Sequence, residues 1–401
     1  MQNPNKFLGN ELQYIKKVLN AESWASTGGS WTGKLEQSFA EKFESKYAIA
    51  FNSGTSTMHA ALLALGVKPG DEVISPALSV IMNTSTTIHA HAIPVYADID
   101  PLTFTIDPDD IERKITNKTK AIMVVSVYGL SADMDRIMDI SRKYNLPVIE
   151  DNAECFLGYY KNKLVGTFGE VSSYSFEDSK HISCGEGGIL TTDNEHVAEI
   201  CRKVGNHGFK NLSAKEGRVK LDLDVFQSPN FKRHDLIGWN YRLSEFSSAI
   251  ALAQLERIDE LVDMRIETAK IFMDRMEGVD YLTPQMSKYD AKNSFWALAV
   301  KYDGHDKRGL SWEDFRKRYI ELGGDGFYGA WSVPYLEPVI SNRKFVDINP
   351  DLYQSINYVK GLCPVAEDIQ QKLMIFKTNY RDLDLAKNKA DILQKLINEI
   401  G

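Results

Sequence analysis

Hydrophobic and polar positions alternate between two patterns along the first half of the chain. Short apolar or β-branched runs are separated by longer stretches with the three- and four-residue spacing of helices, as near Met134–Lys143. Apolar runs bounded by turn residues are typical of strands buried on both faces. The pattern therefore predicts an α/β fold with a doubly wound, mainly parallel sheet. The predicted strands are Tyr47–Phe51, Asp71–Ser75, Ile93–Tyr96, Ala121–Val127, Pro147–Glu150, Val171–Phe176 and Ile189–Thr192.

The pattern changes near Leu243. The stretch SEFSSAIALAQLERIDELVDMRIETAKIFMDRM predicts one long amphipathic helix or a pair of helices. A strand at Asn293–Tyr302 and helices around Ser311–Leu322 and Asp382–Ile400 follow. Because 401 residues exceed the size at which one core stops growing, we expect two domains. The large α/β domain should span residues 1–260, and a smaller C-terminal α+β domain residues 261–401.

Composition narrows the classes of function. A net charge of −8 argues against non-specific nucleic-acid binding, which requires a basic surface. No apolar run approaches the roughly 18 residues of a membrane span, and the first residues lack an apolar leader. We therefore expect a cytoplasmic protein with no membrane partner. The cysteines are widely spaced and predict buried thiols rather than a metal or redox site; they are Cys155, Cys184, Cys201 and Cys363.

The stretch GGSWTGKL, residues 28–35, nearly matches a nucleotide-binding P-loop. Leu35 stands where a magnesium-ligating hydroxyl is required, and no apolar strand precedes the glycines. We therefore interpret it as an ordinary loop. The charged segment Asn206–Asp235 is the best candidate for a mobile active-site segment, and the eight histidines show no spacing typical of metal ligands.

The stretch NSGTSTM, residues 52–58, joins a predicted strand to an apolar helix. Backbone N–H groups and the helix dipole at such a junction can receive a phosphate. The simpler alternative is that Ser53 or Thr55 only caps the helix.

Two further residues stand at predicted strand ends. Asp151 follows PVIE and could anchor a cationic ring nitrogen, or only begin a turn. Lys180 follows YSF, and a lone lysine is usually a solvated surface residue. Together with the Ser-Gly-Thr turn, however, they supply the three groups that bind pyridoxal 5′-phosphate (PLP): a lysine, a carboxylate and a phosphate-binding helix start, or phosphate cup. No competing metal cluster, Ser-His-Asp order or GxGxxG motif uses these residues.

Long stretches of the first 260 residues resemble the DegT/StrS family of sugar aminotransferases, which have the aspartate-aminotransferase fold, fold type I. The resemblance is carried by WTGKLEQSFAEKFESKYAIAFNSGTS, GDEVISPALS, PVYADID, KAIMVVSVYG, VIEDNAE, KLVGTFGEVSSYSFEDSKHISCGEGGILTT, RKVGNHG and GWNYRLSEFSSAIALAQL. Beyond about residue 260 it is confined to segments such as CPVAED.

The resemblance implies a role for each matching residue. Lys180 would be the Schiff-base lysine, and Asp151 would pair with the pyridine N–H. The phosphate would be bound by the backbone at Thr55 and Ser56, by the Ser175 hydroxyl, and by Asn240 from a neighbouring subunit. The catalytic unit would therefore be a homodimer with shared active sites.

Two positions depart from the family pattern. Glu154 stands where the family usually has glutamine, near the phenolic oxygen of the cofactor, and a carboxylate there would repel the phenolate unless it is protonated or paired. Val80 stands where many members stack an aromatic ring on the cofactor.

The resemblance implies amino transfer from glutamate, which becomes 2-oxoglutarate, to an oxo-sugar in surface polysaccharide or lipopolysaccharide biosynthesis. The stretch DIDPLTFTIDPDDIERKITNKTKAI, together with Glu154 and Val80, resembles the branch that aminates an 8-oxo-3-deoxy-octulosonate. The alternative acceptor is a nucleotide-linked keto-hexose.

Two rival functions share the fold. Sugar dehydratases of the family carry histidine at the Schiff-base position, and a non-catalytic regulatory member would lack the complete site. The register places Lys180 at that position with His181 one step later, which favours amination. The run GEGG, residues 185–188, should turn the chain tightly into the next strand, since glycine permits positive φ and close packing.

Overall fold

The computed structural model describes residues 7–21, 29–215 and 217–401. Its largest sheet has seven strands in the order β1-β9-β8-β5-β4-β2-β3. All pairs from β8 to β3 are parallel, whereas β9 is antiparallel to both its neighbours. The predicted doubly wound, mainly parallel sheet is confirmed. The strands are β1 (Tyr47–Phe51), β2 (Glu72–Pro76), β3 (Ile93–Ala97), β4 (Thr119–Val125), β5 (Val148–Asp151), β8 (Val171–Ser175) and β9 (Gly188–Thr192).

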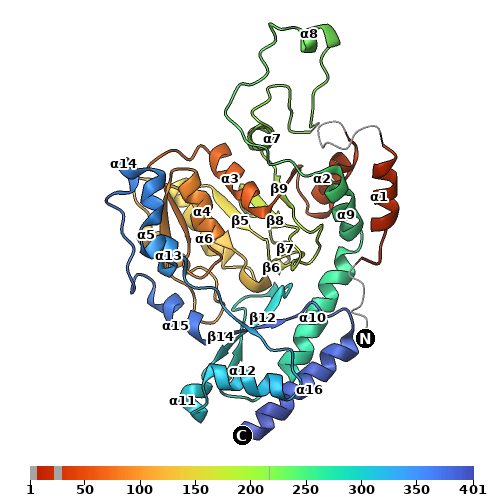
Figure 1. Ribbon diagram of the computed structural model, residues 1–401. Coiled ribbons are helices and arrows are strands. Elements are labelled where there is room, and N and C mark those ends of the chain that lie inside the picture. Colours follow the sequence, from red (N-terminus) through yellow and green to blue (C-terminus); the bar gives the residue numbers. More distant parts are fainter. Residues whose placement is uncertain (1–6, 22–28, 216) are drawn as a thin grey trace.

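Helices cover both faces of this sheet (Figure 1). Along β4, Ala121 and Met123 pack in a cluster with residues of α3 (Gly54–Ala64) and α7 (Glu195–Gly205). The alternate residues, Ile122 and Val124, pack in a second cluster with α5 (Pro108–Lys114) and α6 (Met134–Tyr144). This two-sided burial explains why the strands are apolar throughout.

The end of β4 differs from the prediction. The strand stops at Val125 rather than at Val127, because residues Val127–Gly129 form a 3₁₀ turn in which Tyr128 has a φ of 59°. A left-handed conformation is unusual for a bulky residue and is often found at functional sites. Its consequence for the site is described below.

The predicted long helix is a pair, α9 (Glu245–Leu255) and α10 (Ile258–Asp274). The proposed division at residue 260 lies in the first turn of α10. Beyond it, an antiparallel sheet in the order β10-β12-β14-β13 packs against α12 and α16 and lies below the large sheet in Figure 1. Its elements are β10 (Leu282–Pro284), β12 (Ala297–Tyr302), β13 (Tyr328–Gly329), β14 (Leu373–Lys377), α12 (Trp312–Glu321) and α16 (Leu383–Ile400).

Shorter elements complete the described structure. A small sheet in the order β11-β6-β7 joins Ala291–Lys292, Tyr159–Tyr160 and Lys163–Leu164. The remaining α-helices are α1 (Glu11–Leu19), α2 (Trp31–Lys42), α4 (Met82–His89), α8 (Leu223–Gln227), α11 (Gly304–Arg308), α13 (Pro338–Ser341), α14 (Pro350–Tyr353) and α15 (Pro364–Lys372). No helix among the described residues is long and apolar enough to cross a membrane.

The prediction that residues 28–35 form a loop is wrong for Trp31–Leu35, which begin α2; Gly28 lies outside the described residues. Trp31, Leu35 and Phe39 recur at four-residue steps and are buried. The distant carboxylate of Glu245 accepts hydrogen bonds from the backbone N–H groups of Trp31 (2.7 Å) and Thr32 (3.0 Å). This cap comes from α9, so no local motif indicates that a helix begins here.

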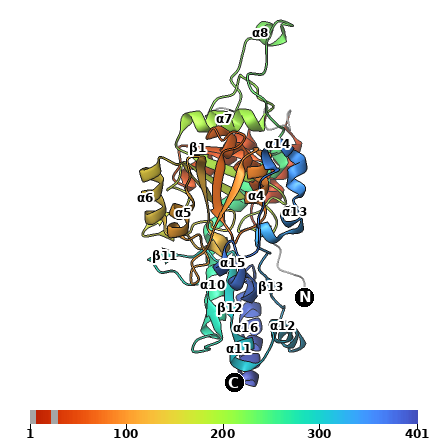
Figure 2. The same cartoon turned by 90° about the vertical axis from the view of Figure 1, so that its left-hand side faces the viewer.

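The charged segment 206–235 contains α8 and projects from the body of the subunit in both views (Figures 1 and 2). It carries strongly exposed apolar side chains, including Leu223 in α8, and Ile237, just beyond its end, is also exposed. None of its described residues lines the cavity of its own subunit.

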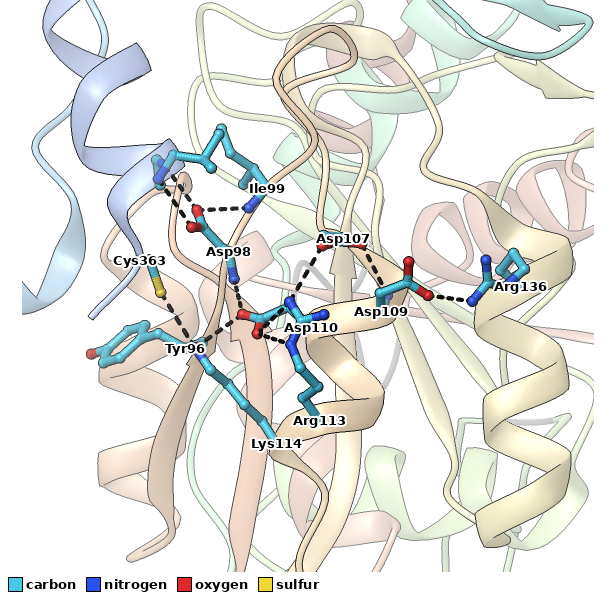
Figure 3. A network of polar contacts seen from close by, with 12 residues as sticks. Tyr96, Asp98, Ile99, Asp107, Asp109, Asp110, Arg113, Lys114, Arg136 and Cys363 are labelled. Atoms are coloured by element: carbon cyan, nitrogen blue, oxygen red, sulfur yellow. Dashed lines mark hydrogen bonds and ion pairs between the residues drawn. The ribbon is translucent and has the colours of Figure 1, made fainter. Parts of the chain in front are cut away.

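A polar network joins the large sheet to the C-terminal part of the chain (Figure 3). The carboxylate of Asp98, just after β3, accepts hydrogen bonds from the N–H groups of Val365 (3.0 Å) and Ala366 (2.8 Å) in the first turn of α15. The N-cap residue of α15, Cys363, makes no side-chain cap. Asp98 therefore caps this helix from a distant strand.

Candidate active site

A cavity of about 490 Å³ opens where β5 and β8 end and α3 begins. Carboxyl ends of parallel strands are where open α/β sheets bind ligands. Five residues singled out in the sequence lie together in its lining: Thr55, Val80, Asp151, Ser175 and Lys180. The other lining residues are Ser53, Gly54, Met58, Ile81, Met82, Ala153, Glu177, Ser179, Glu186, Trp296, Trp331, Ser332 and Glu337.

The start of α3, the predicted phosphate cup, lies at this cavity. The Ser53 hydroxyl caps the helix by accepting a hydrogen bond from the Ser56 N–H at 3.1 Å. The first-turn N–H groups of Gly54 and Thr55 have no intrahelical acceptor and lie at the positive end of the helix dipole. Ser56 is buried outside the cavity lining, so the backbone of Gly54 and Thr55 is better placed than that of Ser56.

Glycine allows the cup to lie against the sheet. A Cβ on Gly188 would lie 2.5 Å from the carbonyl carbon of Ser53, and one on Gly54 would lie 3.0 Å from the Ser175 Cβ. Gly185 has a φ of +88° within the turn that leads into β9. The glycines of residues 185–188 thus serve the turn and close packing, in agreement with the prediction.

Asp151 ends β5 and is only 2% exposed. Its Oδ1 accepts a hydrogen bond from the Ala153 N–H at 3.2 Å. Burial raises the pKa of the Asp151 carboxyl to about 6, and the nearby Glu154 carboxylate adds to this, whereas Lys180 lowers the pKa. A carboxylate here is available to a cationic donor inside the cavity.

Lys180 lies between a carboxylate and an aromatic ring. Its Nζ is 3.2 Å from Oε1 of Glu154 and 4.3 Å from the centroid of the Trp296 ring. The other oxygen of Glu154 accepts a hydrogen bond from the N–H of Tyr128 at 2.9 Å. The left-handed Tyr128 backbone therefore helps to hold the carboxylate that departs from the family pattern, and in this structure that carboxylate is paired.

His181 turns away from the cavity. It is fully buried, its Nε2 lies 2.9 Å from the carbonyl oxygen of Ser294, and its ring packs on Phe156. Burial and the nearby Arg265 lower the pKa of the His181 imidazole well below its usual value. The structure therefore gives Lys180, and not its neighbour, access to a ligand.

Asn240 is exposed and does not line the cavity of its own subunit. Its carbonyl oxygen accepts a hydrogen bond from the Asn52 side chain at 3.5 Å, beside the phosphate cup. A reach into a neighbouring subunit stays a prediction.

Sequence reasoning missed the C-terminal side of the cavity. Trp296 precedes β12, and Trp331 follows β13; their rings stack with centroids 6.0 Å apart. The available signal was Trp331 just after the glycine-rich stretch 323–329, because such surface loops often carry binding residues.

No pattern in the sequence indicated that Arg265 supports the site. Its guanidinium is 2% exposed and donates hydrogen bonds to the carbonyl oxygens of Ser179 (2.7 Å) and Lys180 (3.0 Å). Trp296 Nε1 donates to the same Ser179 carbonyl at 3.1 Å. Arg265 and Trp296 therefore fix the backbone that carries the lysine.

These residues fit PLP. The uncapped N–H groups of α3 and the Ser175 hydroxyl would suit its phosphate, the buried Asp151 would suit its ring nitrogen, and the Lys180 amine, which lines the same cavity, would be the nucleophile for its aldehyde carbon. The absence of a side chain at Gly54 and Gly188 lets the start of α3 and Ser175 lie this close together. The branched side chain of Val80 lines the cavity and provides an apolar surface for the ring, without aromatic stacking.

Comparisons with solved structures identify the fold. A solved aminotransferase from Psychrobacter cryohalolentis superposes with a TM-score of 0.86 and 26% identity, covering 100% of this chain and 99% of that one. A solved GDP-4-keto-6-deoxymannose-3-dehydratase with bound GDP-perosamine superposes with a TM-score of 0.84 and 25% identity, covering 98% and 99%. The predicted fold type I architecture is confirmed.

Sequence comparisons identify the family. GDP-perosamine synthase of Escherichia coli O157:H7 is 36% identical over 292 residues, which cover 73% of this chain and 75% of that protein. The sequence model of the DegT/DnrJ/EryC1/StrS aminotransferase family matches residues 7–342. Because this match spans most of the chain, the protein belongs to the DegT/DnrJ/EryC1/StrS aminotransferase family, which confirms the predicted enzyme class and its cofactor, PLP.

Proposed function

We propose that this enzyme transfers the amino group of glutamate to a nucleotide-linked keto-hexose for the synthesis of a surface polysaccharide. One observation carries the proposal of amino transfer. Lys180, Asp151, Ser175 and the start of α3 come from different strand ends and meet in one cavity. The GDP-linked sugars in the names of the similar proteins favour a nucleotide-linked acceptor over the octulosonate.

When bound, PLP supplies an electron sink for the carbanion that forms at the substrate's α-carbon. Asp151 would keep the ring nitrogen protonated, since its ionised carboxylate accepts that N–H. Thr55, Gly54 and Ser175 would hold the phosphate. Lys180 Nζ would take the proton from the α-carbon and return it to the carbon that receives the amino group, a general-base role that typically contributes 10²–10⁴-fold.

The charge of the cavity supports a shared site in a homodimer. Four carboxylates line it, those of Asp151, Glu177, Glu186 and Glu337, whereas Lys180 is the one Lys or Arg among the described lining residues. A phosphorylated cofactor and a nucleotide need further cationic or amide donors. The exposed Asn240, which follows the projecting charged segment 206–235 in the sequence, is our candidate for the partner's contribution.

Dehydration of the sugar is the second candidate function. The family members that remove a hydroxyl group carry histidine at the position that Lys180 occupies. In this chain the neighbouring histidine is buried against Ser294 and cannot replace the lysine without refolding the turn. We therefore favour amination.

An acceptor panel tests the proposal. The loaded enzyme is incubated with glutamate and either a GDP- or dTDP-linked 4-keto-6-deoxyhexose or 8-oxo-3-deoxy-octulosonate, and 2-oxoglutarate release is measured together with the mass of the sugar product. We expect turnover with a nucleotide-linked sugar, and a product that has gained an amino group. Turnover with the octulosonate alone would overturn the acceptor class, and loss of a hydroxyl group without amine gain would overturn amination.

A further inference from the structure

The side chain of Asn83 is a buried amide beside the site. Asn83 is 2% exposed, and neither its Nδ2 nor its Oδ1 has a hydrogen-bond partner among the described residues. An unsatisfied buried amide is costly, and most buried polar groups in folded proteins are paired. Such a group in a well-packed helix requires an explanation.

The position of Asn83 provides one. It lies in the first turn of α4, directly after Val80, Ile81 and Met82, which line the cavity. Its amide is close enough to Asp151 to lower the pKa of that carboxyl, although no hydrogen bond of good geometry joins the two. The Asp151 carboxylate accepts only one hydrogen bond among the described residues, from the backbone N–H of Ala153.

The charged groups around Asp151 do not supply its carboxylate with a second hydrogen-bond donor. Glu154 disfavours the ionised form of Asp151, and Lys180 favours it, but Lys180 is already paired with Glu154 at 3.2 Å. The remaining donor is the Ala153 N–H at 3.2 Å. An amide donor on the side of α4 would offset the burial of Asp151 without adding a charge.

We propose that Asn83 is a positioning residue for Asp151: its amide N–H donates to one carboxylate oxygen and directs the other toward the ring nitrogen of the bound cofactor. This inference rests on the proposed role of Asp151. It explains why the fold keeps an unpaired amide at this depth, since the hydrogen bond is completed when the carboxylate is held ionised by the ring N–H.

The test uses pyridoxamine 5′-phosphate, which carries an amine in place of the aldehyde and cannot bond covalently to Lys180. Its dissociation constant for the cofactor-free protein is measured by calorimetry between pH 5 and 8, for the wild type and for Asn83→Ala, Asn83→Asp and Asn83→Thr. Circular dichroism checks the fold, and Ser85→Ala on the same helix is the matched control.

We expect Asn83→Ala to weaken binding about 10-fold at neutral pH, since hydrogen bonds to charged groups contribute at about that level. The affinity should also begin to fall at a higher pH than in the wild type. Asn83→Asp should weaken binding more, because it adds a like charge, whereas the hydroxyl of Asn83→Thr should restore most of the affinity and Ser85→Ala should change nothing.

The outcomes separate this inference from the proposed function. Wild-type affinity and pH dependence in Asn83→Asp, with Asp151→Asn weakened, would overturn the role of Asn83 and leave that of Asp151 standing. Unchanged binding by Asp151→Asn would overturn both. If Asn83→Ala does not fold, the contrast between the threonine and aspartate variants decides.

Discussion

At the scale of single residues, burial sets the behaviour of Asp151. Its pKa is about 6 in the folded subunit, above the value of roughly 3.9 in an unfolded chain. The folded state therefore binds this proton more tightly. Its stabilising effect is complete below about pH 4 and is lost as the pH rises through about 6.

Asp151→Asn removes this titration. We expect the cofactor-free variant to be more stable than the wild type by up to about 3 kcal/mol above pH 6, and by less at pH 4. Denaturant unfolding of both proteins between pH 4 and 7 measures the difference. Burial also lowers the pKa of two imidazoles, those of His59 and His181. Both are present in the two proteins, so their contributions cancel. A difference in stability that does not change with pH would contradict the assignment.

Glu154 is the second residue whose surroundings decide its role. It receives two donors, the Lys180 Nζ and the Tyr128 N–H. Glutamine has one acceptor oxygen, so Glu154→Gln turns an N–H group toward one of these donors. We expect a loss of about 1–3 kcal/mol in the cofactor-free protein. Lys180→Met should recover part of that loss, and unfolding free energies in a double-mutant cycle measure the coupling. Strictly additive effects would show that the pair does not interact.

At the scale of elements, the capping of α15 by Asp98 makes the C-terminal part of the chain depend on the large sheet. Asp98→Ala leaves the N–H groups of Val365 and Ala366 without an acceptor. We expect a loss of about 1–2 kcal/mol in the free energy of unfolding. Asp109→Ala is the control in the same network, because its ion pair with Arg136 is exposed (Figure 3) and should contribute under about 1 kcal/mol. Equal losses in the two variants would contradict this account.

The elements also show how far the sequence alone predicts the fold. Each of the seven predicted strands is present with ends shifted by at most two residues, because two-sided burial leaves a clear apolar run. The start of α2 could not be predicted, since its cap comes from Glu245 more than two hundred residues away. The same limit hides Trp296 and Arg265, whose roles depend on the packing of the C-terminal sheet against the lysine turn.

At the scale of the whole molecule, a shared site predicts subunit complementation. Lys180→Ala should be inactive, and Asn240→Ala should lose cofactor. In a hybrid dimer of the two variants, one site would contain Lys180 from one subunit and Asn240 from the other. We therefore expect mixed, refolded subunits to regain up to half of the activity per hybrid dimer, measured after separation by affinity tags.

Two results would refute the shared site. If Asn240 acted within its own subunit, neither site of the hybrid would be intact and activity would stay absent. A monomer with full activity would exclude any contribution from a partner.

The central claim is that Lys180 moves the proton during amino transfer. Its most direct test is a single turnover with PLP-loaded enzyme and glutamate in the absence of any sugar. We predict one 2-oxoglutarate per subunit for the wild type, and a rate lowered by at least about 100-fold in Lys180→Ala. An undiminished rate in that variant, or no 2-oxoglutarate from the wild type, would contradict the account.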